Sequence, residues 1–292
     1  MSLASRNSSL FTRAQALKEV RAFFEQRAVL EVDTPLLSTY APIDLHIDPF
    51  EVEGGYLHSS PEYAMKKLLA AGSGDIYQLG HVFRKGEMGA LHSPEFTMIE
   101  WYRLDTTEEA FIKENLELIS LFLKDLSPKQ LSYHEAFERA VGLPLHAPPH
   151  LLMTQAASRG LYLHDEQDII NLLWGSLVEP TFQDLTIIRE FPHDQAALAQ
   201  IRSGVAERFE IYYKGIELGN GYHELRDPIE QKKRLEQTNQ ARVALGKPPL
   251  ICDPELLASL EKGLPDCYGI ALGFDRLLML REGRRTIHPH LF

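Results

Sequence analysis

Alternating apolar and polar positions mark two segments in the first half of the chain. Residues 76–84 and 96–102 are rich in β-branched and aromatic residues and flank a glycine-containing stretch, which predicts two strands joined by a loop. Side chains alternate between the two faces of a strand. One face of the second strand is therefore expected to carry Phe96, Met98, Glu100 and Tyr102. Because an unpaired buried carboxylate is costly, this mixed face is typical of a binding surface rather than of a core.

Apolar residues at helical spacing predict several helices. We expect one helix from Ser9 or Thr12 to about residue 27, and a second over residues 60–72. Residues 106–176 are expected to be a mostly helical insert.

Helix-capping patterns and charged residues at helical spacing predict further helices. Within the insert, Ser132 with Glu135 forms a capping-box pattern before a helix. Residues 227–246 have charged and amide side chains at helical spacing, so we expect an exposed helix whose charges serve only to solvate it.

Two segments with alternating apolar residues flank Lys214-Gly215 and predict a tight hairpin. With a two-residue loop, Glu210 would face Gly219 and lie diagonally to Glu217 on the same face. Two carboxylates this close repel each other unless a cation lies between them, and hard oxygen ligands suit Mg²⁺ bound with ATP. The spacing alone leaves open a pair of acids that simply faces solvent.

Near the C-terminus, Gly269, Ala271 and Gly273 are expected to share one face of a strand. That face carries almost no side-chain bulk, so a ligand can lie flat against it. A helix follows, with Arg276 near its N-terminus, where both the guanidinium and the helix dipole favour a phosphate.

Composition narrows the classes of function. The chain has 292 residues, 44% hydrophobic content and a formal net charge of -11, which argues against a protein that wraps nucleic acid over a broad basic face. Its two cysteines exclude a disulfide scaffold. No run of about 18 apolar residues is present, and residues 1–9 lack the apolar run of a signal peptide. We therefore expect a cytoplasmic protein without a membrane partner.

Several motifs together resemble the class II aminoacyl-tRNA synthetases. The string HSPEFTMIEWYR resembles their second signature, in the wording of the lysyl branch, and GIALGFDRLL resembles the third. The helix, short strand and Thr-Pro before residue 37 resemble the first signature, which forms the dimer interface in that family. The strings SSPEYAMKKLL and IELGNGYHEL resemble the lysine-binding segments of lysyl-tRNA synthetases. The resemblance implies an α+β fold with an antiparallel sheet flanked by helices, one catalytic domain over residues 1–292, and a homodimer.

Only about ten residues precede the first signature, so the anticodon-binding OB-fold domain of lysyl-tRNA synthetases is expected to be absent. The chain is most similar to the free-standing paralogues of this catalytic core that ligate lysine to elongation factor P. This resemblance implies ATP and Mg²⁺, activation of lysine or (R)-β-lysine as an adenylate, and elongation factor P as the acceptor. A tRNA or a small amine as acceptor, and a catalytically silent binding or regulatory subunit, stay open as alternatives; the net charge disfavours tRNA.

The same resemblance assigns residues to roles. Arg84 and Arg276 would be catalytic, on the α- and γ-phosphates. The ATP site would comprise Arg84, Lys85, Gly86, Glu87, His92, Ser93, Phe96, Glu217, Leu218, Gly273 and Arg276. The amino acid would contact Ser60, Pro61, Glu62, Glu100, Tyr102, Asn220, Glu224 and Ala271, and the metal would be held by Glu210 and Glu217.

Several positions depart from the family pattern, and one of them is Ser93, where close relatives have Asn. Class II enzymes usually have Glu where this chain has Gly86, with Glu87 one position later, so either Glu87 or the backbone would read the adenine. Lysyl-tRNA synthetases usually have Gly where this chain has Ala271, which resembles the free-standing paralogues.

Overall fold

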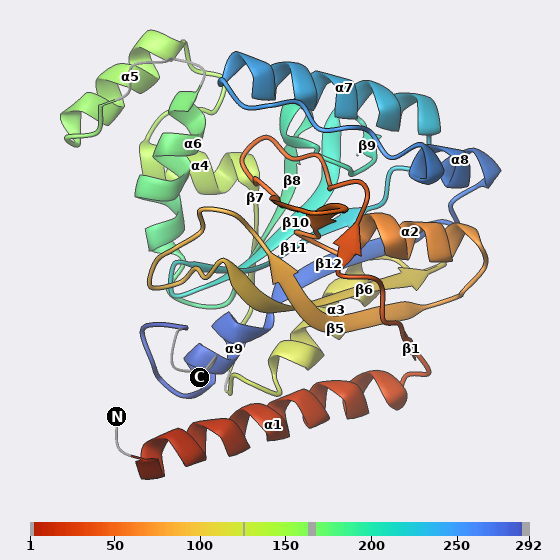
Figure 1. Ribbon diagram of the computed structural model, residues 1–292. Helices are drawn as coiled ribbons and strands as arrows, with labels where there is room; N and C mark the ends of the chain where they lie inside the picture. The colour runs from red at the N-terminus through yellow and green to blue at the C-terminus, as the bar shows by residue number, and fades with distance from the viewer. Residues whose placement is uncertain (1–2, 125, 163–167, 288–292) are drawn as a thin grey trace. The chain divides into compact units, whose positions relative to one another are not determined.

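The chain forms two compact units in the computed structural model, which describes residues 3–124, 126–162 and 168–287 (Figure 1). The first unit consists of residues 1–124 and 223–292, and the second of residues 125–222. Among the described residues, no helix has both the length and the apolar character that a membrane crossing requires.

A mostly antiparallel sheet runs through the first unit. Its strands are β1 (Leu30–Glu31), β5 (Ile76–Phe83), β6 (Glu95–Leu104) and β12 (Cys267–Gly273), hydrogen-bonded in that order. β1 runs parallel to β5, and β6 runs antiparallel to both of its neighbours, β5 and β12. The two strands expected around the glycine-containing loop are confirmed as β5 and β6. Residues 97–102 of β6 are all buried, so both faces of this strand are covered.

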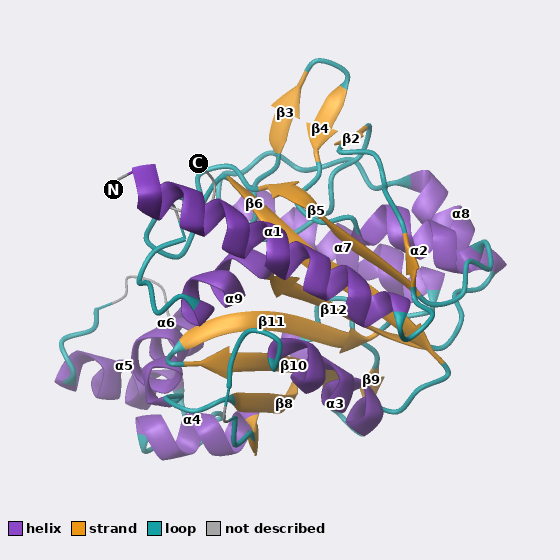
Figure 2. Cartoon of the chain, turned by 90° about the horizontal axis from the view of Figure 1, so that it is seen from below, coloured by secondary structure: helices purple, strands orange, loops and turns teal. Residues whose placement is uncertain are grey.

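Helices and a small sheet complete the first unit. The helices are α1 (Leu3–Glu25), α2 (Glu62–Ala70), α3 (Glu108–Ile119), α7 (Pro228–Ala244), α8 (Pro254–Lys262) and α9 (Phe274–Arg281). The small antiparallel sheet consists of β2 (Leu37–Ser38), β4 (Gly55–Leu57) and β3 (Phe50–Val52), and Figure 2 shows its β3–β4 hairpin projecting from the unit.

The start predicted for the first helix is wrong. α1 begins at Leu3 rather than at Ser9 or Thr12, because no Pro or Gly in the preceding residues stops the helix. Its apolar face packs as the spacing predicted: Phe24 is fully buried and stacks on Tyr77 of β5, with ring centroids 4.1 Å apart.

The second unit has its own sheet. Its strands are β7 (Lys129–Ser132), β8 (Thr186–Pro192), β10 (Val205–Tyr213) and β11 (Ile216–His223), paired in that order, with β9 (Ile201–Arg202) also on β10. The expected mostly helical insert therefore includes strand β7. Strand β7 pairs in parallel with β8, which lies far along the chain, so no pattern of neighbouring residues predicts β7. Residues 125 and 163–167 of that insert lie outside the described residues.

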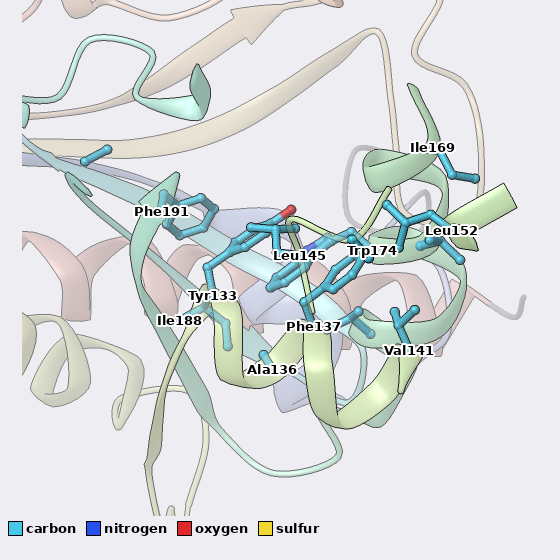
Figure 3. Close-up of a cluster of buried hydrophobic side chains, with 14 of the residues drawn as sticks. Tyr133, Ala136, Phe137, Val141, Leu145, Leu152, Ile169, Trp174, Ile188 and Phe191 are labelled. Carbon is cyan, nitrogen blue, oxygen red and sulfur yellow. The ribbon is translucent and has the colours of Figure 1, made fainter. Parts of the chain in front are cut away.

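Short helices and an aromatic core complete the second unit. The helices are α4 (Tyr133–Val141), α5 (Pro149–Ser158), α6 (Ile169–Leu173), a π-helical turn η2 (Trp174–Val178), and the 3₁₀ turns η3 (Glu179–Thr181) and η4 (His193–Gln195). Ser132 and Glu135 make the reciprocal capping box that the sequence predicted. In the core, Tyr133 stacks on Trp174 with ring centroids 3.8 Å apart, beside Phe191 (Figure 3).

The predicted hairpin is β10–β11, but its register is shifted. Lys214 and Gly215 both have positive φ (52° and 71°), as a tight two-residue hairpin turn requires. The register breaks after Ile211, so Glu210 pairs with Asn220 and not with Gly219. The cause is a bulge, which a count of residues across the turn does not reveal.

Candidate active site

Three glutamates, a tyrosine and a lysine meet inside the first unit. Helix α2 contributes Glu62 and, one turn later, Lys66; β6 contributes Glu100 and Tyr102; Glu224 follows β11. Lys66 Nζ lies 2.6 Å from Glu62 Oε1 and 2.6 Å from Glu224 Oε2. Glu100, Glu224 and Lys66 are only 3%, 1% and 1% exposed. The chain therefore buries more acidic than basic groups here, which suits a cationic ligand.

Hydrogen bonds fix the middle carboxylate of this acidic cluster. Ser60 Oγ donates to Glu100 Oε2 at 2.7 Å, and Tyr102 Oη donates to Glu100 Oε1 at 2.8 Å. Ser60 Oγ also accepts a hydrogen bond from the Glu62 amide at 3.0 Å. Ser60 therefore both stabilises the start of α2 and orients Glu100. Pro61, predicted at the first helical position, instead lies just before the helix.

Burial perturbs both deeply placed acids. Burial, together with the charge of Glu62, raises the pKa of Glu100 to about 8. Burial raises the pKa of Glu224 to about 7, although the ammonium of Lys66 opposes the rise. Near neutral pH Glu100 is consequently mostly protonated and Glu224 is partly protonated, and an arriving ammonium would displace these protons.

The glycine face of β12 forms one wall of the cluster. Gly269 pairs with Tyr102, and Ala271 pairs with Glu100. A Cβ on Gly269 would lie 2.6 Å from Cδ1 of Tyr102 and would overlap Glu224 Oε1 as well. At Gly269 the space that the missing side chain leaves is occupied by Tyr102 and Glu224, so a ligand lying flat on this face stays a prediction.

A second group, centred on Arg84, follows β5. The Arg84 guanidinium lies 5.1 Å from the centre of the Phe96 ring, and its Nη1 is 3.8 Å from Glu87 Oε1. Gly86 has φ +81°, a left-handed conformation that favours glycine, which explains why the usual Glu does not stand there. Lys85 N donates to Asp48 O at 2.8 Å. A flat aromatic ring beside a guanidinium can receive a base and a phosphate.

Arg276 and His92 form a third group. Arg276 Nη2 lies 2.9 Å from His92 Nε2, and Arg276 Nε donates to Leu91 O at 3.3 Å. Burial and the Arg276 charge lower the pKa of His92, so its ring stays neutral and accepts from the guanidinium. Ser93 is buried, and Gly273 caps α9 just before Arg276. This group can take a second phosphate.

The second unit holds the two predicted metal ligands. Glu210 is 6% exposed, and its carboxylate is bonded by Arg208 and by Tyr212 Oη. Burial raises the pKa of Glu210 and the charge of Glu217 adds to this rise, whereas the charge of Arg208 opposes it. Glu210 and Glu217 are therefore near each other, as predicted. Asn220 Oδ1 accepts a hydrogen bond from Arg208 Nε at 3.2 Å. Leu218 lies at the β-bulge in the pairing of β10 with β11.

These two carboxylates fit a divalent cation only with help from the nucleotide. Within residues 3–124, 126–162 and 168–287, no three His, Cys, Asp or Glu residues gather around a possible metal position. Glu210 and Glu217 would supply two hard oxygen ligands, and ATP phosphates would have to supply others.

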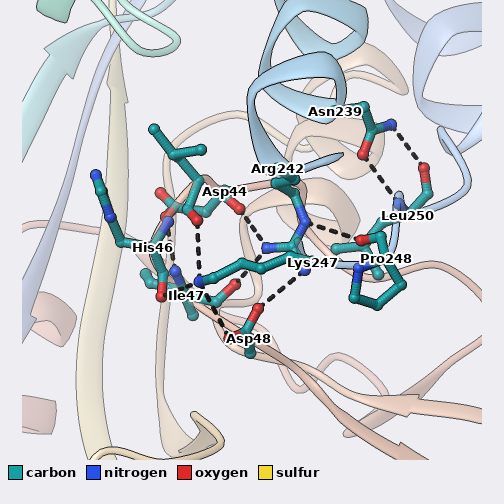
Figure 4. Close-up of polar contacts among 10 residues, drawn as sticks. Asp44, His46, Ile47, Asp48, Asn239, Arg242, Lys247, Pro248 and Leu250 are labelled. Carbon is teal, nitrogen blue, oxygen red and sulfur yellow. Dashed lines mark hydrogen bonds and ion pairs between the residues drawn. The ribbon is translucent and has the colours of Figure 1, made fainter. Parts of the chain in front are cut away.

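Arg242 overturns the expectation that the charges of α7 only solvate it. This side chain is 1% exposed and donates to Asp44 O (2.7 Å), Ile47 O (3.2 Å) and Asp48 Oδ1 (2.9 Å) (Figure 4). Asp48 O in turn holds the amide of Lys85. The end of α7 thus fixes the segment that supports the Arg84 loop.

Sequence reasoning also missed Lys66 and Arg208, the two cations inside the acidic groups. A signal for Lys66 was present, because it stands four residues after Glu62 on the same helix. The structure brings the predicted residues of the first unit into the three groups above. Their roles toward ligands stay predictions.

Comparisons with known proteins agree with this geometry. The family model of tRNA synthetases class II (D, K and N) matches residues 2–291. Elongation factor P–(R)-β-lysine ligase of Pasteurella multocida is 44% identical, covering 96% of this chain and 93% of its own length. The proteins of that name from Vibrio cholerae and Klebsiella pneumoniae (strain 342) are 43% and 45% identical, with 96% of this chain and 93% and 92% of their own lengths covered. The chain belongs to the class II tRNA synthetase family, which confirms the resemblance and the fold class inferred from the sequence.

Proposed function

We propose that this chain is an ATP-dependent ligase that activates lysine or (R)-β-lysine as an aminoacyl-adenylate and transfers it to a lysine ε-amine of elongation factor P. The observation that carries the amino-acid choice is the cluster of the buried Glu100, Tyr102 and Glu224 with the partly exposed Glu62. The relatives named as elongation factor P–(R)-β-lysine ligases support the acceptor.

The acidic cluster would bind both amines of the substrate. Glu62, the most exposed of its carboxylates, would take the α- or β-amine. Glu100, Tyr102 and Glu224 would surround the ε-ammonium. A buried carboxylate binds an ammonium strongly because the low dielectric strengthens their attraction and neither charge is left unpaired.

Adenylation would follow from positioning and charge neutralisation. The substrate carboxylate attacks the α-phosphorus, a new O–P bond forms, and pyrophosphate leaves. Arg84 would neutralise charge on the α-phosphate and Arg276, oriented by His92, on the γ-phosphate. Phe96 would stack on adenine. Mg²⁺, held by Glu210, Glu217 and ATP, would neutralise further phosphate charge.

The transfer step needs no further cofactor. The lone pair of the acceptor ε-amine attacks the activated carbonyl, the C–O bond to AMP breaks, and the amine loses a proton to solvent. The product is an amide, and the other product is AMP.

ATP–pyrophosphate exchange tests the activation step. The chain is incubated with α-lysine, with (R)-β-lysine and without an amino acid. We expect exchange that depends on one of the two lysines. The absence of exchange with either would contradict the proposal and favour a silent binding subunit, whereas exchange followed by charging of a tRNA would identify the alternative acceptor.

We also propose that the chain forms a homodimer. Helix α1 and the segment after it expose apolar residues that a monomer would leave in water: Leu10 (56%), Phe11 (77%), Leu30 (57%) and Leu36 (43%). Light scattering should give twice the mass of one chain. A Phe11→Asp substitution should shift the protein toward the monomer, and a wild-type chain that is monomeric at micromolar concentration would contradict this.

A further inference from the structure

Asp275 links three elements of the first unit, directly beside Arg276. It lies in the first turn of α9 and is 2% exposed. Its Oδ2 accepts a hydrogen bond from the Thr97 amide of β6 at 2.6 Å, and its Oδ1 accepts one from Arg13 Nη1 of α1 at 2.5 Å. Arg13 Nη2 also donates to Thr97 Oγ1 at 2.6 Å. The Arg13 guanidinium therefore bridges β6 and α9 with two of its nitrogen atoms.

These contacts hold together two parts of the proposed ATP site. Phe96 directly precedes Thr97 on β6, and Arg276 directly follows Asp275 on α9. The backbone pairing of β6 with β12 stops where β12 ends, at Gly273. One position beyond that pair, the Asp275 carboxylate binds the Thr97 amide. A side chain thus continues the connection between β6 and α9 where the strand pairing stops.

Arg13 supplies the positive charge that this arrangement requires. Its side chain is 15% exposed, and its guanidinium lies 5.1 Å from the centre of the Phe274 ring. A buried carboxylate without a cation is costly, because its charge stays unpaired. The guanidinium neutralises that charge, and its planar fork fixes the direction of two partners at once, which the single ammonium of a lysine does not do.

We infer that Arg13 is a positioning residue of the ATP site: through its two partners it fixes Phe96 relative to Arg276, so that one nucleotide contacts both. This inference rests on the proposed function, in which Phe96 stacks on adenine and Arg276 neutralises the γ-phosphate. Arg84 and Phe96 belong to the β5–β6 side of the site, whereas Arg276 belongs to α9. Loss of the link would leave each side in place but misalign the two, which weakens a ligand that must reach both.

Two nucleotides distinguish misalignment from general damage to the site. ATP must bring its γ-phosphate to Arg276 while its adenine lies on Phe96. ADP has no γ-phosphate, so its contacts are on the β5–β6 side. In Arg13→Met, we expect the Kd of ATP to rise about tenfold, the contribution of one hydrogen bond to a charged group, and the Kd of ADP to change much less. The KM of lysine in pyrophosphate exchange should stay near its wild-type value, because the acidic cluster shares no residue with this link.

The experiment is a calorimetric titration of the whole chain with ATP and with ADP, in the presence of Mg²⁺ and without lysine, for wild type, Arg13→Met and Glu19→Ala. Glu19→Ala is the matched control, because Glu19 also joins α1 to α9. It pairs with Arg281 at 2.6 Å, at the other end of α9, and the two side chains are 27% and 29% exposed. We expect the ratio of the ATP Kd to the ADP Kd to rise for Arg13→Met and to keep its wild-type value for Glu19→Ala.

A purely structural role for Arg13 predicts a lower melting temperature with an unchanged ratio, and an unchanged ratio in the folded variant would overturn the inference. An equal rise in Glu19→Ala would also overturn it, because any loosening of α1 from α9 would then have the same effect. If Arg13→Met does not fold, Arg13→Lys keeps the charge beside Asp275 without the fork, and a smaller rise in the same ratio is expected; no rise would count against the inference. Failure of wild type to bind ATP would refute the proposed function, whereas wild-type binding of ATP with an unchanged Arg13→Met ratio would refute only this inference.

Discussion

Replacement of Gly269 by alanine tests whether the acidic cluster is the lysine site. The new Cβ would lie 2.6 Å from Cδ1 of Tyr102 and would overlap Glu224 Oε1. Neither neighbour can swing into solvent, because Tyr102 is 2% exposed and Glu224 is 1% exposed. Overpacking of this kind costs about 1–3 kcal/mol. This cost falls on the folded protein and should lower its melting temperature; because the clash displaces Tyr102 and Glu224, we also expect the KM of lysine to rise.

The assay is the KM of lysine and of ATP in pyrophosphate exchange, together with the melting temperature. Gly269→Ala should raise the KM of lysine and leave the KM of ATP nearly unchanged, since Arg84 and Arg276 are not displaced. Gly80→Ala is the matched control in the same sheet, because its Cβ would make only an ordinary contact, 3.5 Å from Gln78 Nε2. A folded Gly269→Ala enzyme with the wild-type KM for lysine would refute the assignment of the pocket.

Further predictions address the charges. Glu224→Gln leaves Lys66 without one of its buried partners and should raise the KM of lysine at least about 100-fold, since breaking a buried pair costs about 3–5 kcal/mol; normal activation would exclude this pocket. Because the pKa values of Glu100 and Glu224 are raised to about 8 and about 7, lysine affinity should fall as pH drops from 8 to 6, and calorimetry should detect proton release on binding; a flat profile would contradict these shifts. Arg276→Ala should abolish exchange, and an active variant would exclude its phosphate role. Arg242→Met should lower the melting temperature by several degrees, because it orphans buried carbonyls, and an unchanged melting temperature would show that its contacts contribute nothing.

Local patterns predicted those parts of the fold that depend on neighbouring residues. Ser132 and Glu135 form the expected capping box because both partners belong to one helix turn. Lys214-Gly215 turns as expected because a two-residue hairpin favours that dihedral pattern. Glu100 has partners in Ser60 and Tyr102, as a carboxylate on an otherwise apolar strand requires, and its role toward a ligand stays a prediction.

Features that depend on distant residues could not be predicted in this way. Strand β7 exists through its pairing with β8, more than fifty residues later. The bulge after Ile211 changes the partner of Glu210 without any change in composition. Arg242 looks like any other cation on a polar helix, and its bonds to the carbonyls of residues 44 and 47 and to Asp48, almost 200 positions earlier in the sequence, make it a buried anchor.

The most direct test of the account is the intact mass of elongation factor P after incubation with this chain, ATP, Mg²⁺ and (R)-β-lysine, with a parallel reaction containing α-lysine. The account predicts a mass gain equal to one lysine residue, lost when ATP is omitted or when the acceptor lysine of the factor is substituted. An unchanged mass under conditions in which ATP–pyrophosphate exchange proceeds would contradict the proposed acceptor.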